Sequence, residues 1–289
     1  MKIVSFTHQG GARLGVCDGD TVVDLKVAAP DLPADLIALI NMGEPGWAAV
    51  KKALASASPE QRRPLSSLAL RPPIARPGKI ICLGLNYVDH AAEGGHAKPT
   101  YPSFFMRGST SLVAHGQPIR RPRVSTQLDY EAELVAVIGK TARNVKKERA
   151  LDYVVGYSCF NEASIRDYQR KTAQWTIGKN FDGTGAFGPW MVTADELPPG
   201  GAGLAIRCRL NGQVMQDADT SDMIFPVDET IQLLTECLTL EPGDILVMGT
   251  PAGVGWARKP PVFMKAGDTV EIEIERIGVL RNPVAEEAS

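Results

Sequence analysis

The sequence contains no run of about 18 apolar residues, which is the length that an apolar helix needs to cross a membrane. It also lacks an excess of charge of either sign, because 31 Lys and Arg stand against 33 Asp and Glu. No basic surplus therefore points to nucleic acid or to an anionic lipid surface. The start, MKIVSFTHQGG, has no apolar segment like that of a secretory signal. We expect a cytoplasmic protein with neither nucleic acid nor membrane as a partner.

Cysteine is scarce, and no two cysteines form a Cys-x-x-Cys pair, which excludes zinc ribbons and thioredoxin-type redox motifs. The five residues are odd in number and scattered through mostly apolar segments, so we expect reduced, buried and inert thiols. They are Cys17, Cys82, Cys159, Cys208 and Cys237.

The chain shows no repeats, and its first part differs from the rest. Residues 2–8, 13–19 and 20–25 predict short strands, and residues 31–43 and 46–58 predict helices. Three prolines within residues 67–79 exclude a helix or a central strand there. We therefore predict a small α+β domain over residues 1–70 and a larger domain over residues 71–289.

The larger domain reads as a succession of strands with long connections. One helix is predicted, over residues 228–240, because its apolar residues recur at helical spacing. Strands that follow one another, rather than alternating with helices, indicate an α+β and mostly β fold and not a doubly wound sheet. The predicted strands lie in residues 79–87, 103–109, 128–140, 154–164, 244–250 and 268–280.

The segment GTGAFG, residues 183–188, matches the GxGxxG pattern of dinucleotide-binding proteins. That pattern binds a pyrophosphate only when a helix begins directly after it. Here Pro189 and Trp190 follow and no helix is predicted, so we do not expect a nucleotide site.

Two like charges stand inside an apolar run, in LDYEAELVAVIGK. In a strand, Glu131 and Glu133 would project from one face, roughly 6–7 Å apart at Cα. Two carboxylates in apolar surroundings repel each other and lose solvation. Either this face is solvated, or a hard divalent cation such as Mg²⁺ or Mn²⁺ lies between the carboxylates.

Further polar residues gather where other predicted strands end. Clusters of this kind at several strand ends of one domain indicate a shared site. They comprise His90 and Glu93; Glu162, Arg166, Asp167 and Gln169; Lys179, in a glycine-flanked loop; and Thr250.

Six segments, in this order, resemble the fumarylacetoacetate hydrolase family, and in particular its bacterial acylpyruvate hydrolase-like members. They are GLNYVDHAAE, PSFFMRGST, DYEAEL, GYSCFNEASIRDYQ, GKNFDGTGAFGP and GDILVMGTPAGVG. The resemblance extends from about Lys79 to the end of the chain. It implies a mixed β-roll catalytic domain, a homodimer, and an extra small N-terminal domain like that of some bacterial members.

The resemblance also implies one Mg²⁺ or Mn²⁺ ion held by Glu131, Glu133 and Glu162. In the third position the family more often has Asp, in a segment like NDxSxRD, whereas this chain has NEASIRD. Asn161 should point to the opposite strand face and is not expected to be a ligand.

For the other site residues, the resemblance implies distinct roles. His90 and Glu93 would be a catalytic pair on a lid, and we expect residues 91–99 to be mobile without ligand. Lys179 would be catalytic, and the substrate would contact Arg166, Gln169 and Thr250. Trp175, Phe181 and Trp256 could form apolar pocket walls, or they could be ordinary core or dimer contacts.

A metal-chelated 2-keto acid is the implied substrate. The first expectation is hydrolysis of the C–C bond of a 2,4-diketo acid, an acylpyruvate or a fumarylacetoacetate-like compound, after His90 takes a proton from water. Oxaloacetate decarboxylation, and isomerisation or hydration of unsaturated 2-keto acids, need the same enolate and stay open. A keto-acid binding protein without catalysis is the alternative of another class.

Overall fold

The computed structural model describes residues 1–95 and 97–287, and its largest element is a mixed sheet of twelve strands. Strand β5 (Ala69–Arg71) pairs with β1 and β8 (Leu112–Ala114) with β14, beside the main path of the sheet. That path runs through β4 (Arg62–Pro64), β3 (Thr21–Asp24), β2 (Gly11–Asp18), β1 (Lys2–His8), β14 (Gly185–Thr193), β12 (Val154–Glu162), β11 (Ala132–Ile138), β17 (Ile245–Val247), β6 (Ile80–Gly84) and β7 (Ser103–Met106).

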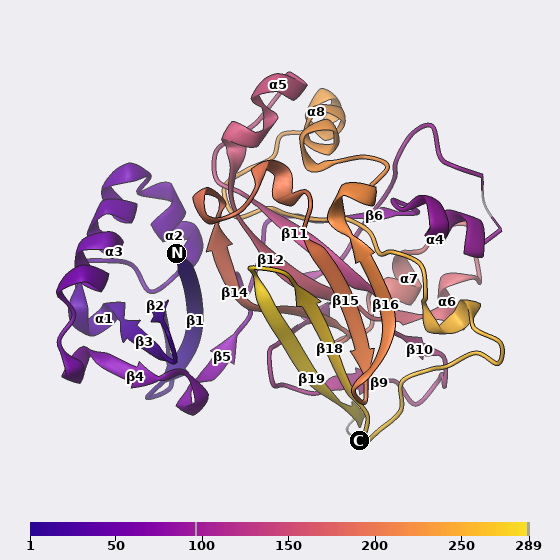
Figure 1. Ribbon diagram of the computed structural model, residues 1–289, viewed down its shortest axis with the longest axis horizontal. Helices are drawn as coiled ribbons and strands as arrows, with labels where there is room; N and C mark the ends of the chain where they lie inside the picture. Colours follow the sequence, from indigo (N-terminus) through magenta and orange to yellow (C-terminus); the bar gives the residue numbers. More distant parts are fainter. Residues whose placement is uncertain (96, 288–289) are drawn as a thin grey trace.

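A second sheet of five strands packs on the first, with β15, β16, β18 and β19 in front of β11 and β12 (Figure 1). Its order is β16 (Gln213–Asp219), β15 (Ala205–Leu210), β18 (Thr269–Ile274), β19 (Gly278–Glu286) and β9 (Ile119–Arg121). Leu134 and Ala136 of β11 share one apolar core with Ile206 and Ile272 of the second sheet. The fold is therefore the expected α+β, mostly β roll.

The helices are few and short. They are α1 (Leu25–Ala28), α2 (Leu36–Asn41), α3 (Glu44–Ser56), α4 (Val88–Glu93), α5 (Lys147–Ala150), α6 (Arg166–Gln169), α7 (Thr176–Lys179) and α8 (Val227–Cys237). Helix α8 buries Val227, Ile231 and Leu234 on one face, as its spacing predicts. Nowhere in residues 1–95 or 97–287 is a helix both long and apolar enough to span a membrane.

The first 70 residues are not detached from the rest. Strand β1 is hydrogen-bonded to β14, with Lys2 opposite Val192 and Ile3 opposite Met191, so one sheet runs through both parts. Their apolar cores also merge, since Ile3 and Leu36 belong to the same buried cluster as β11 and β17 side chains. The boundary at residue 70 stays a prediction.

Three expectations about local structure are wrong. Residues 128–140 form two strands, β10 (Leu128–Asp129) and β11, because the Asn161 side chain accepts a hydrogen bond from the Glu131 N–H. Lys179 is the last residue of α7 and not part of a loop. Cys237 is exposed at the end of α8, and Cys17 is only half-buried, whereas Cys82, Cys159 and Cys208 are buried as expected.

Candidate metal centre and active site

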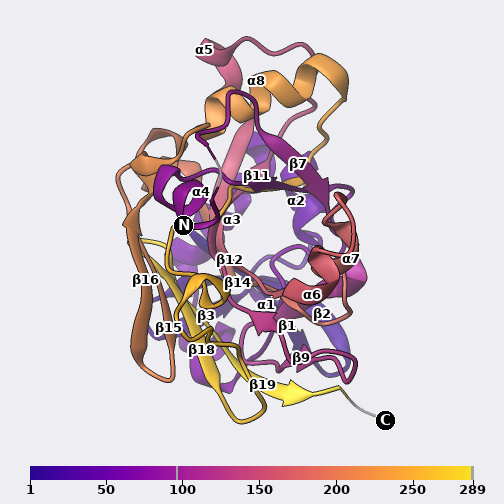
Figure 2. The same cartoon turned by 90° about the vertical axis from the view of Figure 1, so that its right-hand side faces the viewer.

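One pocket of about 470 Å³ is lined by residues of α4, α6 and α7. In Figure 2, α4 lies on one side of the domain and α6 and α7 lie on the other. The strand ends of β6, β11 and β12 and the loop after β17 close the pocket. Nine of the residues that the sequence nominated line this pocket: His90, Glu93, Glu131, Glu133, Glu162, Arg166, Gln169, Lys179 and Thr250. Asp167, named in the same cluster as Arg166, does not line it and instead accepts a hydrogen bond of 2.6 Å from Ser125 Oγ. The structure thus brings them together, although their roles remain predictions.

Three buried carboxylates form the centre of the pocket. Glu131 precedes β11, Glu133 lies within β11, and Glu162 ends the neighbouring strand β12, where its N–H donates to the Glu131 carbonyl oxygen at 3.0 Å. One carboxylate oxygen of each lies within 4.8 Å of the other two, and none of the three is more than 2% exposed. Strand pairing, and not sequence proximity alone, therefore assembles the cluster.

Two cations contact the first of these carboxylates. Lys179 Nζ lies 2.5 Å from Glu131 Oε2, and Arg166 Nη2 lies 2.6 Å from Glu131 Oε1. Burial alone would raise the pKa of Glu131, but the charges of Arg166 and Lys179 outweigh it and lower that pKa to about 2. Burial lowers the pKa of Lys179, but the charges of Glu131 and Glu162 outweigh it and raise that pKa above its usual value. Both groups are therefore charged at neutral pH.

Glu133 has a different environment. Its Oε2 accepts a hydrogen bond of 2.6 Å from the Gly249 N–H, and within the described residues no cation forms an ion pair with it. Burial, followed by the charges of Glu162 and Glu131, raises the pKa of Glu133 well above its usual value. Gly249 has φ of +86°, and a Cβ there would lie 2.6 Å from the Asn86 Cβ, so glycine is required beside this carboxylate.

The cluster fits a divalent cation. Glu162 Oε1 is buried without a hydrogen-bond partner, and the nearest guanidinium nitrogen, Nη1 of Arg107, is 3.6 Å away. With Glu133 ionised, as a metal ligand must be, the buried carboxylates around the pocket, Asp129 included, would outnumber the buried cations Arg107, Arg166 and Lys179 by one. Spare carboxylate oxygens and uncompensated negative charge are what Mg²⁺ and Mn²⁺ bind. Glu131, Glu133 and Glu162 would hold such an ion.

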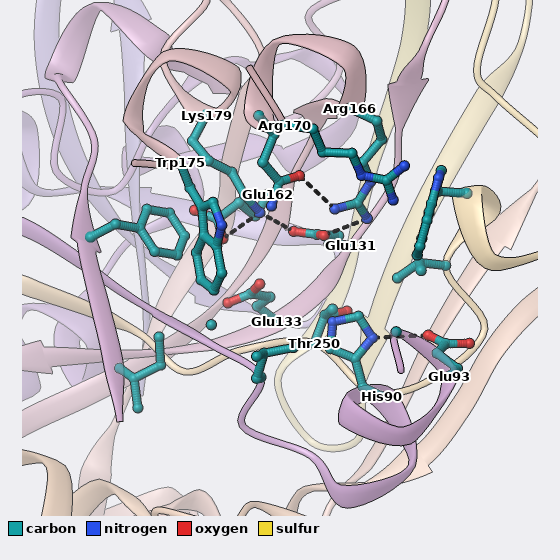
Figure 3. Close-up of a pocket in the computed structure, with 18 of the residues that line it drawn as sticks. His90, Glu93, Glu131, Glu133, Glu162, Arg166, Arg170, Trp175, Lys179 and Thr250 are labelled. Carbon is teal, nitrogen blue, oxygen red and sulfur yellow. Dashed lines mark hydrogen bonds and ion pairs between the residues drawn. The ribbon is translucent and has the colours of Figure 1, made fainter. Parts of the chain in front are cut away.

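The His–Glu pair lies across the pocket from Lys179 (Figure 3). His90 Nδ1 is 2.9 Å from Glu93 Oε1, one helical turn along α4. The Gly253 N–H holds the Glu93 carboxylate in turn, at 3.0 and 3.2 Å from its two oxygens. With Nδ1 occupied by Glu93, the imidazole can exchange a proton at Nε2.

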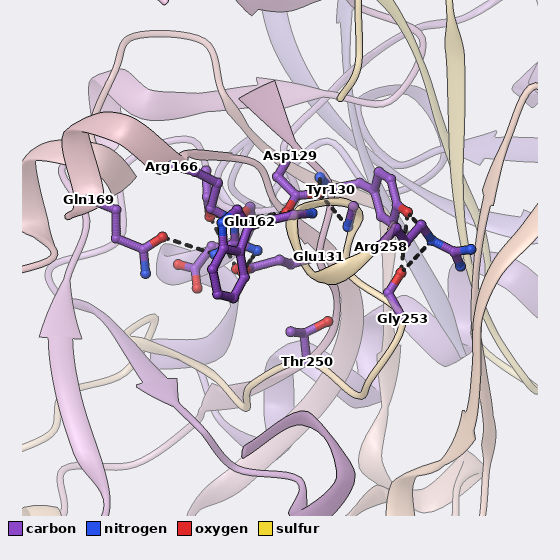
Figure 4. A network of polar contacts seen from close by, with 12 residues as sticks. Asp129, Tyr130, Glu131, Glu162, Arg166, Gln169, Thr250, Gly253 and Arg258 are labelled. Carbon is purple, nitrogen blue, oxygen red and sulfur yellow. Dashed lines mark hydrogen bonds and ion pairs between the residues drawn. The ribbon is translucent and has the colours of Figure 1, made fainter. Parts of the chain in front are cut away.

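The groups expected to contact substrate are anchored by residues that the sequence analysis did not single out. Arg166 Nε donates to Asp129 at 2.8 Å, and Arg166 Nη1 donates to Gln169 at 2.9 Å (Figure 4). Buried Gln216 donates to Thr250 Oγ1 at 2.8 Å. The short sheet of β10 and β13 (Ser164–Ile165) places Asp129 beside Arg166.

Sequence reasoning missed these supports for an identifiable reason. Asp129 and Gln216 stand alone in apolar or alternating strands, where a solvated position is the ordinary explanation. Arg170 could have been found, because it follows Arg166 by four residues and both line the pocket. Asn161, which was not expected to be a ligand, accepts a hydrogen bond from the Glu131 N–H and so fixes the backbone there.

The expected apolar walls are correct in part. Trp175 and Trp256 line the pocket, whereas Phe181 does not and packs edge-on against Tyr168, with ring centroids 5.0 Å apart. The segment expected to be a mobile lid begins inside α4, where Ala91 is fully buried. His96, in the same segment, lies outside the described residues, and the mobility of the segment stays a prediction.

The fumarylacetoacetate (FAA) hydrolase C-terminal family matches residues 79–285, the part of the chain that contains every residue of this pocket. The chain belongs to the fumarylacetoacetate hydrolase family. The match confirms the family that the sequence motifs indicated, and members of this family are enzymes that act on keto acids.

Three similar proteins place the chain within the family. The mitochondrial oxaloacetate tautomerase fahd2 of Xenopus laevis is 41% identical over 98% of this chain and 90% of its own length. A fumarylacetoacetate hydrolase from Exiguobacterium antarcticum superposes with a TM-score of 0.86, at 33% identity over 99% of this chain and all of its own. Maleylpyruvate hydrolase from Sphingobium sp. SYK-6, solved with manganese(II) and pyruvate, covers both chains fully with a TM-score of 0.83 and 29% identity. These findings support a divalent metal in the pocket.

Proposed function

We propose that this protein is a divalent-metal-dependent tautomerase that interconverts the keto and enol forms of oxaloacetate or a closely similar 2-keto acid. The observation that supports this most is the opposition, in one pocket, of a proton-transferring His–Glu pair and a carboxylate cluster flanked by two cations. The similarity to an oxaloacetate tautomerase over 98% of the chain favours tautomerisation among the reactions that share an enolate.

Each residue of the pocket would have its own role in the reaction. A bound Mg²⁺ or Mn²⁺ would supply Lewis acidity to the keto group of the substrate. Lys179 and Arg166 add positive charge where the enolate oxygen and the carboxylate of the substrate would lie. His90 Nε2 would take the proton from C3 of the keto form, and Glu93 would stabilise the resulting imidazolium. A proton returned to the C2 oxygen then completes the enol, so the composition of the substrate is unchanged.

Hydrolysis of an acylpyruvate is the second candidate, favoured by the likeness to maleylpyruvate hydrolase. The same His90 Nε2 would take a proton from water, and the hydroxide would attack the distal carbonyl carbon. The bond between C3 and C4 then breaks, and the pyruvate enolate that leaves takes up a proton at C3. The homodimer stays a prediction. The cytoplasmic location also stays a prediction, and the Xenopus relative is named mitochondrial.

The two candidates differ in their products, so one substrate panel separates them. Enol oxaloacetate diluted from an aprotic solvent should lose its enol absorbance faster with the Mg²⁺-loaded protein than without it. Acetylpyruvate and fumarylpyruvate are assayed for released pyruvate under the same conditions. Pyruvate release at a rate far above tautomerisation would make the protein a hydrolase and reject the first proposal.

A further inference from the structure

Arg170 lines the same pocket and is not among the residues to which a role has been given. It directly follows α6, and its N–H donates to the Arg166 carbonyl oxygen at 3.2 Å, which continues one helical turn. Residues four apart on a helical turn project from one face. Arg166 and Arg170 consequently enter the pocket side by side, on the side opposite His90 (Figure 3).

The guanidinium of Arg170 rests on an aromatic platform. Its central carbon lies 3.4 Å from the ring centroid of Trp256, a cation–π arrangement. The backbone N–H of Trp256 donates to Asp129 at 2.9 Å, and Asp129 also accepts from Arg166. Asp129 therefore holds both Arg166 and the backbone of Trp256, the residue on whose ring Arg170 rests.

Arg170 differs from the other cations of the pocket in having no carboxylate partner within residues 1–95 and 97–287. Arg166 is paired with Asp129 and Glu131, and Lys179 with Glu131 and Glu162. Arg170 is exposed overall, yet the desolvation that it does undergo, and next the charge of Arg166, lower its pKa, and the charge of a bound anion would oppose both effects.

We propose that Arg170 binds the distal carboxylate of a dicarboxylic 2-keto acid and thereby makes the pocket selective for substrates with two acid groups. The inference rests on the proposed function, in which the first carboxylate and the keto oxygen occupy the metal centre. A four-carbon acid such as oxaloacetate then has one negative charge left over, and Arg170 is the unpaired cation of the pocket. A guanidinium can bind that carboxylate through two hydrogen bonds.

Equilibrium binding to the Mg²⁺-loaded full chain tests this without tautomerisation. The two ligands are oxalate, which chelates but has no distal group, and the 3,3-dimethyl analogue of oxaloacetate, which has no C3 hydrogen and cannot tautomerise. Arg170→Gln should weaken binding of the dimethyl analogue roughly tenfold to a hundredfold, the usual effect of losing a charged hydrogen bond. Binding of oxalate should change less than about threefold.

Lys171 provides the matched control, since it is exposed, stacks on Tyr168 and does not line the pocket. Lys171→Gln removes the same charge one residue away and should leave both affinities unchanged. Arg170→Lys should restore part of the loss. Equal losses for the two ligands, or no binding of the dimethyl analogue to the unmutated protein, overturn the assignment of Arg170. Binding of that analogue without tautomerisation of oxaloacetate overturns the proposed function alone.

Discussion

Lys179 Nζ lies 2.5 Å from Glu131 Oε2, so a buried ammonium already compensates one carboxylate of the proposed metal centre. The same nitrogen is 3.3 Å from Glu162 Oε2. Glu133 has no such cation within the described part of the chain. The three carboxylates are therefore compensated unequally, and Glu133 is the one without a cation beside it.

Replacing Glu133 by Gln should stabilise the metal-free protein and abolish its stabilisation by Mg²⁺. Because folded Glu133 keeps its proton to higher pH than in the unfolded chain, where its pKa is about 4.3, stability without metal falls as the pH rises above that value. Glu133→Gln should thus gain about 1–2 kcal/mol at pH 8 and little at pH 5. Urea unfolding in EDTA at both pH values measures the difference.

In the presence of the metal, the unmutated protein should become the more stable of the two. Excess Mg²⁺ should stabilise the unmutated protein through binding to the folded state and should leave Glu133→Gln nearly unaffected. A variant that is less stable than the unmutated protein at pH 8 in EDTA would show that Glu133 is not a strained, unpaired carboxylate.

Glu162 stands where the family more often has Asp, and its carboxylate reaches the cluster directly. Glu162→Ala should weaken Mn²⁺ binding at least tenfold, or roughly 1.4 kcal/mol, because a charged ligand is removed. Glu162→Asp should lose less, since the charge remains and only the reach changes. Calorimetric titration with Mn²⁺ decides it, and an unchanged affinity in Glu162→Ala excludes Glu162 as a ligand.

His90 is expected to move protons, and its removal should cost about 10²–10⁴ in turnover, the usual size of a general-base effect. His90→Ala should lower tautomerisation and any acylpyruvate hydrolysis alike. Oxaloacetate decarboxylation needs neither proton abstraction nor activated water, so it should fall much less. Equal losses in all three rates would mean that His90 closes or shapes the pocket instead.

Asp129 is a buried support for the site, since it accepts hydrogen bonds from Arg166 and from the Gly255 and Trp256 N–H groups. Asp129→Asn leaves Arg166 with a single carboxylate and should destabilise the fold by about 3 kcal/mol in urea unfolding. Exposed Asp182 is the control, and Asp182→Asn should stay within about 0.5 kcal/mol of the unmutated protein. A small effect of Asp129→Asn would show that Arg166 does not need this partner.

The sequence predicted the strand-rich fold and the residues of the pocket because both leave local signals. Glu131 and Glu133 are conspicuous as charges in an apolar run, and His90 and Glu93 have helical spacing. The interruption of the strand between β10 and β11 has no such signal, since it depends on a hydrogen bond to Asn161, thirty residues away.

Other features were hidden because they depend on contacts between distant segments. Asp129 gains its role only when the backbone of Gly255, 126 residues further along, folds over it. Strands β1 and β14 likewise pair although they lie more than 180 residues apart in the sequence. The alternation of apolar and polar residues within either strand cannot reveal that pairing. Arg170 was overlooked although its spacing from Arg166 was visible.

The central claim is that one divalent ion held by the three glutamates makes this pocket a catalyst for a 2-keto acid. It is tested most directly by titrating Mg²⁺ into chelator-treated protein while following the enol absorbance of oxaloacetate. We expect the rate to start at the uncatalysed value and to reach a plateau at one ion per chain, with no such rise in Glu133→Gln. Full tautomerisation by protein verified to be free of metal would contradict the account.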